Sequence, residues 1–244
     1  MAVFNGNKID RKKEKLDSSR PINPSVLRKI REDMDLRWTY NSNAIEGNTL
    51  TLNETKVVLE GITVGGKKLI EHLEVINHKF AIDYVECLVK DAKRLSESDI
   101  KHIQRLILKG IDDHYAGRYR DRKVLISGAS HIPPEHFILK TEMESMLFRY
   151  NNIDAPIYNK IAFLHGEFVR IHPFIDGNGR TARLLVNLEL MKLGYPPILI
   201  KIADRQEYYS LLDECCLIRN YDKFGDFIKI RMNQSLDLYI SCLE

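Results

Sequence analysis

The spacing of apolar side chains constrains the fold of this chain more than any other sequence feature. Apolar residues recur every three or four positions through most of the sequence, which is the spacing of a helix with one buried face. Two such stripes are Val26, Ile30, Met34 and Trp38, and Ile161, Leu164, Phe168 and Ile171. Together with local capping patterns, the spacing predicts helices over residues 25–45, 51–61, 67–90, 97–110, 135–150, 156–170, 178–193, 204–219 and 222–240.

Residues 117–134 break this pattern. Their sequence, GRYRDRKVLISGASHIPP, places consecutive apolar residues before Gly, Ser and paired prolines, which suits a short β-hairpin better than a helix. We therefore expect an all-α bundle that carries one small β-hairpin flap.

The excess charge of the chain lies at its N-terminus. Residues 1–20 contain six basic and three acidic side chains, and the whole chain has a net charge of +3, so the rest is balanced. Pro21 and Pro24 mark where ordered structure is expected to begin. The sequence therefore predicts a flexible basic tail over residues 1–24 and a single domain over residues 25–244.

Composition and charge argue against several classes of protein. With 244 residues, of which 44% are hydrophobic, the chain can bury a large core, so disorder is not expected. A balanced domain offers no broad basic surface to nucleic acid, and no apolar run approaches the roughly 18 residues of a membrane span. The N-terminus lacks an apolar signal stretch, and the four cysteines show no CxxC spacing. We expect a cytoplasmic protein with reduced thiols and no membrane contact, and a nucleic-acid partner is disfavoured.

Residues 172–183, HPFIDGNGRTAR, contain the residue types of a phosphate site. The run Gly177, Asn178 and Gly179 can turn successive backbone N–H groups inward at the start of the next helix, where anions bind. Arg180 and Arg183 share one face of that helix and can neutralise phosphates. The pattern also fits an ordinary loop followed by a solvated helix start.

Two further side chains of this segment carry metal-binding or acid–base chemistry. Asp176 is a hard oxygen donor that can hold Mg²⁺ against phosphates. His172 has an ordinary pKa of about 6.5, which suits it to accept a proton from a hydroxyl group. A zinc site at His165, Glu167 and His172 is disfavoured, because the two histidines lack the i, i+4 spacing of a helical zinc motif.

The segment HPFIDGNGRTAR resembles the HxFx(D/E)GNGRxxR signature of the Fic family at every defining position. Residues 117–134 resemble the family's target-docking flap, and RQEYYSLLDECC resembles its nucleotide-side helix, so the resemblance covers roughly residues 35–235. Fic proteins usually transfer AMP from ATP to a protein hydroxyl. The resemblance therefore implies a protein adenylyltransferase with a Fic core over about residues 67–240, with ATP as substrate and Mg²⁺ as cofactor.

The resemblance also implies roles for individual residues. His172 would be the catalytic base and Asp176 the metal ligand. The nucleotide would contact Asp176, Gly177, Asn178, Gly179, Arg180, Thr181, Ala182, Arg183, Tyr208 and Tyr209. The target protein would dock by strand addition along Leu125, Ile126, Ser127, Gly128, Ala129, Ser130 and His131. Cys216 departs from the family, which often has Asn there, so contacts to the purine are less well defined.

A second motif, SNAIEGN over residues 42–48, resembles the inhibitory motif (S/T)xxxE(G/N) of Fic proteins that restrain themselves through an N-terminal helix, here about residues 25–46. A glutamate in the last turn of a helix faces the negative end of the helix dipole, which is unfavourable unless a cation compensates it. The family pattern implies that Glu46, followed by Gly47, pairs with Arg183, and that Ser42 helps to hold it. A solvated glutamate is the competing interpretation.

Several activities remain open beside AMP transfer to a Ser, Thr or Tyr hydroxyl of a target protein or of the enzyme itself. The same site can remove AMP by hydrolysis if Glu46 positions a water molecule. Transfer of phosphocholine, UMP or phosphate is also open, as are a nucleotide sensor without catalysis and a nucleic-acid-binding regulator that uses the basic tail. The expected partners are ATP and a target protein, and a homodimer is left open.

Overall fold

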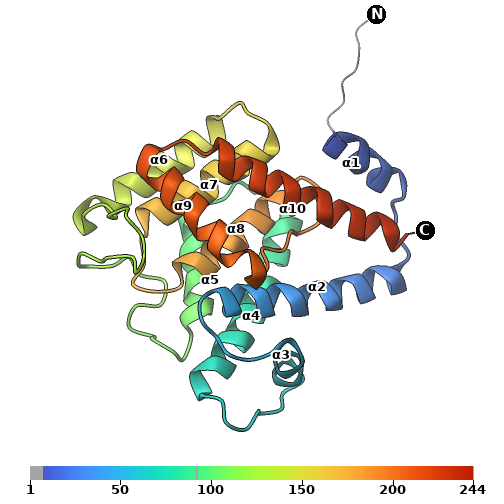
Figure 1. The fold of residues 1–244 in the computed structure, drawn as a ribbon, viewed down its shortest axis with the longest axis horizontal. Helices are drawn as coiled ribbons and strands as arrows, with labels where there is room; N and C mark the ends of the chain where they lie inside the picture. The colour runs from blue at the N-terminus through green and yellow to red at the C-terminus, as the bar shows by residue number, and fades with distance from the viewer. Residues whose placement is uncertain (1–7, 92, 244) are drawn as a thin grey trace, which may run out of the picture.

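The computed structural model of the protein describes residues 8–91 and 93–243 (Figure 1). The elements in chain order are α1 (Lys8–Ser18), α2 (Pro24–Ile45), α3 (Leu52–Leu59), α4 (Leu69–Asp91), α5 (Glu97–Leu108), η1 (His136–Ile138), α6 (Leu139–Asn152), α7 (Ile157–Ile171), α8 (Asn178–Lys192), η2 (Ile202–Asp204), α9 (Arg205–Ile218) and α10 (Asp222–Ser241). These residues include no strand, and none of their helices is both long and apolar enough to cross a membrane. The prediction of an all-α bundle is confirmed.

The β-hairpin predicted within residues 117–134 is not seen, and the segment runs as an irregular loop between α5 and η1. Its polar groups bind other parts of the chain. The N–H of Arg120 donates to the carbonyl oxygen of Pro173 (2.9 Å), and the N–H of Ser130 donates to Oδ1 of Asp213 (2.8 Å). The paired prolines have no N–H to donate. With these donors engaged elsewhere or missing, the segment forms no ladder of its own.

Helix boundaries follow the capping signals in the sequence. The side chain of Asn23 accepts an N–H of the first turn of α2. Thr51 with Glu54, and Ser96 with Asp99, form reciprocal capping boxes at the starts of α3 and α5. Both boxes belong to the local capping patterns used to predict these helices, and they satisfy N–H groups that a helix start leaves without partners.

Helix α7 lies at the centre of the bundle, packed against α6, α8, α9 and α10 (Figure 1). Every residue from Ile161 to Phe168 is buried. Gly166 permits this packing, because a Cβ there would lie 2.4 Å from the ring of Tyr221. Burial on all sides fixes the end of α7, and with it the turn that leads into α8.

Residues 8–18, which the sequence places in a flexible tail, form α1 and pack on α10 (Figure 1). Ile9 and Leu16 are buried, and Lys12 Nζ donates to Asp237 of α10 (2.7 Å). The two apolar residues are seven positions apart and share one helix face, so a narrow stripe holds a helix that is otherwise charged. Residues 1–7 of the predicted tail lie outside the described residues.

Helix α2 brings the second motif to the start of α8. It packs against α3, α4 and α8, and its last turns bury Ser42, Asn43 and Ile45. Glu46 follows as the residue that ends the helix. The two sequence motifs, although they lie more than a hundred residues apart in the chain, therefore meet in space.

The docking of α1 predicts a stability effect. Replacing Leu16 by Ala leaves a cavity between α1 and α10, so we expect Leu16→Ala to lower the free energy of unfolding by about 2–5 kcal/mol in urea titrations. Leu193→Ala, which changes an exposed leucine, serves as the control and is expected to stay within about 0.5 kcal/mol. Equal stability of the two variants would contradict the packing of α1.

Candidate active site

The site is built on the turn that joins α7 to α8. His172 ends α7 in the left-handed region (φ 49°, ψ 59°), and Gly177 takes φ 80° directly before α8. The side chain of Asn178 spans the turn, since its Oδ1 accepts from the N–H of Phe174 (3.0 Å) and its Nδ2 donates to the carbonyl of Phe174 (2.8 Å). The side chain of Asn178 thus fixes the turn backbone and holds the N-terminus of α8, a favourable place for an anion.

Arg183 of α8 directs its guanidinium at the end of α2. Nη2 donates to Oε1 of Glu46 (2.7 Å) and to the carbonyl of Ser42 (2.8 Å), and Nε donates to Oγ of Ser42 (3.0 Å). Nη1 donates to the hydroxyl of Tyr208 (3.4 Å). Burial alone would lower the pKa of Arg183, but the interactions with Glu46 and Tyr208 together outweigh it and raise that pKa, so the buried group stays charged.

The carboxylate of Glu46 lies directly over Gly179, in the run Gly177, Asn178 and Gly179 that we call the predicted phosphate cradle. A Cβ built at Gly179 would be 2.2 Å from Oε1 of Glu46 and 3.2 Å from Nη1 of Arg183. Glycine is therefore required at this position while Glu46 occupies the space. The Glu46 carboxylate lies near the N-terminus of α8, where the helix dipole favours a negative charge. This offsets its unfavourable position at the C-terminal end of α2.

Arg180, the other arginine of α8, is held between two carboxylates. Nη1 donates to Oε1 of Glu74 on α4 (2.9 Å), and Nη2 donates to Oδ2 of Asp176 (3.2 Å). The arginine side chain is 3% exposed, Glu74 is 18% exposed and Asp176 is 61% exposed. The guanidinium is thus fixed on the buried side by Glu74 and on the open side by Asp176.

His172 differs from the ordinary histidine that the sequence suggests. Burial lowers its pKa to about 4, and the nearby Arg120 guanidinium acts in the same direction. The imidazole is therefore neutral at pH 7, the form that can accept a proton. Arg120 also donates from Nε to the carbonyl of His172 (2.9 Å), so it holds the backbone of the residue whose pKa it lowers.

A cavity of about 490 Å³ opens beside this turn. The loop over residues 117–134 forms part of its wall, and residues of α9 form another part. Predicted residues that line it are Glu46, Ile126, Ser127, Gly128, Ala129, His131, His172, Gly179, Tyr208, Tyr209 and Cys216. The inhibitory, catalytic, flap and nucleotide-side residues predicted from separate segments therefore share one cavity.

Other predicted residues lie around the cavity and do not line it. These are Ser42, Gly47, Leu125, Ser130, Asp176, Gly177, Asn178, Arg180, Thr181, Ala182 and Arg183. Thr181 and Ala182 are completely buried in α8, so the structure places them behind the cradle. The Leu125 side chain is exposed. Gly47 takes φ +103°, the conformation in which the chain leaves α2.

Metal-binding chemistry centres on Asp176. Within the described part of the chain, no group of three or more His, Cys, Asp or Glu side chains is arranged to hold a metal ion. A single exposed carboxylate still suits Mg²⁺, which is commonly held by one or two carboxylates together with substrate phosphates. The disfavoured zinc interpretation finds no support, because Nε2 of His165 bonds the Tyr208 hydroxyl (2.9 Å) and Glu167 pairs with Arg170 (3.0 Å).

Several supporting residues lie outside every motif that the sequence presents. Gln104 of α5 donates from Nε2 to the carbonyl of Asp176 (3.0 Å), and Asp213 of α9 holds the N–H groups of Ser130 and His131 (2.8 and 3.0 Å). Glu74 joins them as the partner of Arg180. Their partners are distant in sequence, so only the folded structure reveals these contacts.

Glu71 of α4 fixes the chain that follows the second motif. Its Oε1 accepts from the N–H of Thr49 (2.8 Å) and from the Thr49 hydroxyl (2.6 Å), and its Oε2 accepts from the N–H of Lys68 (3.0 Å). These donors lower the pKa of Glu71 from an ordinary value of 4.5 to about 2. The ionised carboxylate thus anchors the loop between α2 and α3 to α4.

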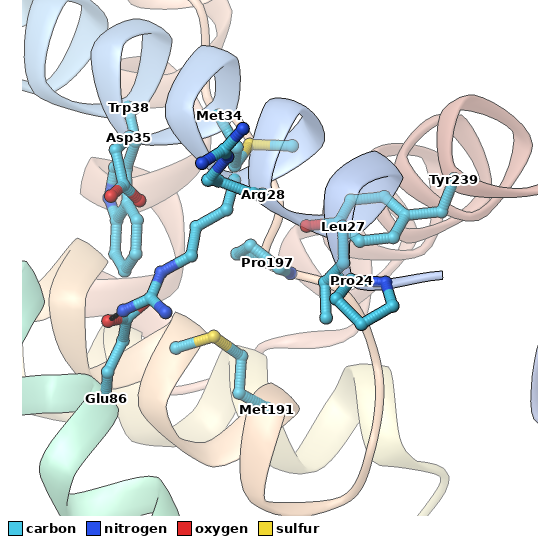
Figure 2. A pocket seen from close by; sticks show the side chains of 11 residues that line it. Pro24, Leu27, Arg28, Met34, Asp35, Trp38, Glu86, Met191, Pro197 and Tyr239 are labelled. Atoms are coloured by element: carbon cyan, nitrogen blue, oxygen red, sulfur yellow. Dashed lines mark ion pairs between the residues drawn. The ribbon is translucent and has the colours of Figure 1, made fainter. Parts of the chain in front are cut away.

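A second cavity, of about 340 Å³, lies along the N-terminal half of α2 (Figure 2). Figure 2 shows Leu27, Trp38, Met191 and Tyr239 around it. It shares no lining residue with the cavity beside the α7–α8 turn. Its residues come from α2, from Glu86 of α4, from Pro197 and from the ends of α8 and α10, and none was singled out as a site residue from the sequence.

Comparison with known proteins assigns this arrangement to a family. Residues 94–190 match the Fic/DOC family. A Fic domain-containing signaling protein from Bacteroides thetaiotaomicron is 31% identical with a TM-score of 0.89, and the match covers 97% of each chain. Fic-1 from C. elegans is 30% identical with a TM-score of 0.83, and the match covers 96% of this chain and 71% of that one. The chain belongs to the Fic/DOC family.

Curated relatives extend the comparison to longer proteins. A protein named Protein adenylyltransferase Fic from Nematostella vectensis is 35% identical over 243 residues, covering 96% of this chain and 55% of the relative. One of the same name from Drosophila virilis is 34% identical over 238 residues, covering 95% of this chain and 48% of the relative. The chain spans about half the length of these curated relatives.

The lowered pKa of Glu71 predicts a pH-dependent contribution to stability. Because the folded pKa is below the unfolded one, the contribution is complete above about pH 4.5 and is lost as the pH falls toward 2. We expect the difference in unfolding free energy between the parent and Glu71→Gln to shrink from pH 6 to pH 3 in urea titrations. Glu60→Gln, at an exposed carboxylate, is the control, and a difference independent of pH would contradict the prediction.

Proposed function

We propose that the protein is an adenylyltransferase that transfers AMP from ATP to a hydroxyl group of a target protein, and that Glu46 restrains it. The observation that carries the proposal is the contact of Glu46 with Arg183 over the N-terminus of α8, because Glu46 lines the same cavity as His172. Membership in the Fic/DOC family and the names of the curated relatives support AMP transfer.

The chemistry follows from the groups around the cavity. The neutral imidazole of His172 accepts the proton of the target hydroxyl, whose oxygen forms a bond to the α-phosphorus of ATP. The bond from that phosphorus to the bridging oxygen breaks, and pyrophosphate leaves. The N–H groups at the start of α8 and the guanidinium of Arg180 stabilise the negative charge on the phosphates. The protein supplies position and charge and forms no covalent bond to substrate.

Asp176 would hold Mg²⁺ beside the phosphates. When bound, the ion supplies positive charge that neutralises phosphate oxygens. Asp176 suits this role because its carboxylate is exposed and lies next to the cradle, while Gln104 fixes its backbone carbonyl. Its present contact with Arg180 keeps the carboxylate near the N-terminus of α8.

The restraint rests on the donors of Arg183. The arginine side chain is 4% exposed and the glutamate side chain 30% exposed, so Glu46 is the partner that can move into water. A phosphate group that is to reach Arg183 must displace the carboxylate, which also occupies the space over Gly179. Glu46 therefore opposes productive ATP binding by position and by charge. Its release would free both the guanidinium and the cradle.

Target docking is proposed along the irregular loop over residues 117–134. Residues 126–129 and His131 line the cavity beside His172. Because Asp213 already holds the N–H groups of Ser130 and His131, we place the docking strand at residues 124–127. Backbone pairing there would bring a target hydroxyl to His172 with little dependence on the neighbouring sequence.

Removal of AMP from a modified protein is a second candidate activity. The observation that favours it is that Glu46 and His172 line the same cavity. A carboxylate in this place can orient a water molecule for attack on the phosphodiester. Glu46 would then oppose transfer and promote removal, which makes its substitution informative for both activities.

Labelling from α-³²P-ATP tests the proposal. We expect weak label in the parent, at least about tenfold faster labelling in Glu46→Gly because Arg183 is released, and at least about a hundredfold loss when His172→Ala is added. Glu60→Gly is the matched control, since Glu60 also ends a helix and is followed by a glycine with positive φ. It should label like the parent.

Absence of label in Glu46→Gly, on itself and on lysate proteins, would contradict AMP transfer. Retained ATP binding in that variant would then favour a nucleotide sensor. Loss of AMP from a pre-modified protein in the parent, but not in Glu46→Gly, would favour removal as the main activity.

The lowered pKa of His172 predicts the pH profile of transfer. The base must be neutral, and with a folded pKa of about 4 it is neutral at all pH values well above that. We expect kcat/KM of Glu46→Gly to vary less than about twofold between pH 5.5 and 8, and to fall as the pH approaches 4. Initial rates measured with circular dichroism as the folding control test this. A midpoint near 6.5 would contradict it.

A further inference from the structure

Arg180 depends on a glutamate that no sequence motif contains. Glu74 lies on α4, 106 residues away in sequence, and its Oε1 accepts from Nη1 of Arg180 at 2.9 Å. The arginine side chain is 3% exposed, so its charge is largely removed from water. A buried guanidinium needs a fixed anionic partner, and Glu74 supplies it from the buried side.

The carboxylate of Glu74 is itself held at its second oxygen. Nδ2 of Asn48 donates to Oε2 of Glu74 (2.8 Å) and to the carbonyl of Glu71 (3.0 Å). Asn48 follows Glu46 by two residues. One oxygen of Glu74 therefore faces the arginine and the other faces the segment that carries the inhibitory glutamate, so the carboxylate has little freedom to turn.

The second carboxylate that contacts Arg180 is that of Asp176, which has a different role in the proposed reaction. Asp176 contacts Nη2 at 3.2 Å and is the residue expected to hold Mg²⁺. With Asp176 engaged there, Glu74 is the protein carboxylate left to fix the guanidinium. Small displacements of a charged group that faces the reacting phosphates are costly, because they weaken its interaction with the transition state.

We propose that Glu74 is a positioning residue for Arg180. It holds the guanidinium against the phosphate cradle, and Asn48 holds Glu74 in turn. This inference rests on the proposed function, because it assigns Arg180 to the phosphates of ATP. It adds a residue of α4 to the site and ties the loop after the inhibitory motif to the second arginine of α8.

Variants in the Glu46→Gly background test the proposal. Glu74→Ala removes the acceptor, and we expect it to lower kcat about tenfold while raising KM for ATP only about threefold. Glu74→Gln keeps a carbonyl oxygen for Nη1 of Arg180 but loses the charge and the acceptor for Asn48, so we expect it to recover part of the loss and to lower kcat only about threefold. Glu189→Ala is the matched control: Glu189 lies on α8 like Arg180, bonds Tyr150 (2.7 Å) and Lys192 (2.9 Å), and should leave both values unchanged.

Binding of Mg²⁺ with α,β-methylene-ATP, measured by calorimetry, gives a readout that does not require transfer. We expect Glu74→Ala to raise Kd about threefold and Glu74→Gln to raise it less. If Glu46→Gly failed to label, the proposed function would fail, and the Kd comparison would still decide the role of Glu74. Unchanged Kd and kcat in Glu74→Ala, or equal losses in the Ala and Gln variants, would overturn the inference.

Discussion

The buried charge of Arg183 is the constraint on which the rest of the site depends. A guanidinium out of water is tolerated only where acceptors surround it, and here α2 supplies them with the carbonyl and hydroxyl of Ser42 and the carboxylate of Glu46. The end of α2 is therefore docked on α8 by these hydrogen bonds and by an ion pair. In the proposed reaction a phosphate group replaces Glu46, so the guanidinium exchanges one anion for another and is never left without a partner.

The charges around the N-terminus of α8 explain why such an exchange is needed. Arg180 and Arg183 face three carboxylates, those of Glu46, Glu74 and Asp176. This arrangement has no net positive charge with which to attract a triphosphate. Moving Glu46 into water and neutralising Asp176 with a divalent cation would reverse the balance, leaving Glu74 as the carboxylate that still orders an arginine. The three carboxylates, similar in chemistry, thus have distinct roles because their burial and their partners differ.

The sequence predicts those parts of the molecule that local rules determine. Capping boxes and apolar spacing place the helices, and the two motifs place His172 and Glu46. It does not predict that Ile9 and Leu16 dock α1, because two apolar residues among charges are a weak signal. It also mistakes residues 117–134 for a hairpin, since the partners of that backbone lie on α9 and in the α7–α8 turn. Glu74 and Gln104 are hidden for the same reason: their roles exist only through contacts far apart in sequence.

Gly179 shows why restraint and catalysis compete for the same space. A side chain there would clash with Glu46, whose Oε1 lies 2.2 Å from the position of a Cβ. The open backbone that suits the close approach of a phosphate is also what admits the carboxylate. A side chain at this position would push the Glu46 carboxylate away and would also obstruct the approach of a phosphate. In the proposed mechanism, Gly179 therefore leaves space both for a phosphate of ATP and for the Glu46 carboxylate that competes with it. The position of α2 decides which of the two anions occupies this space.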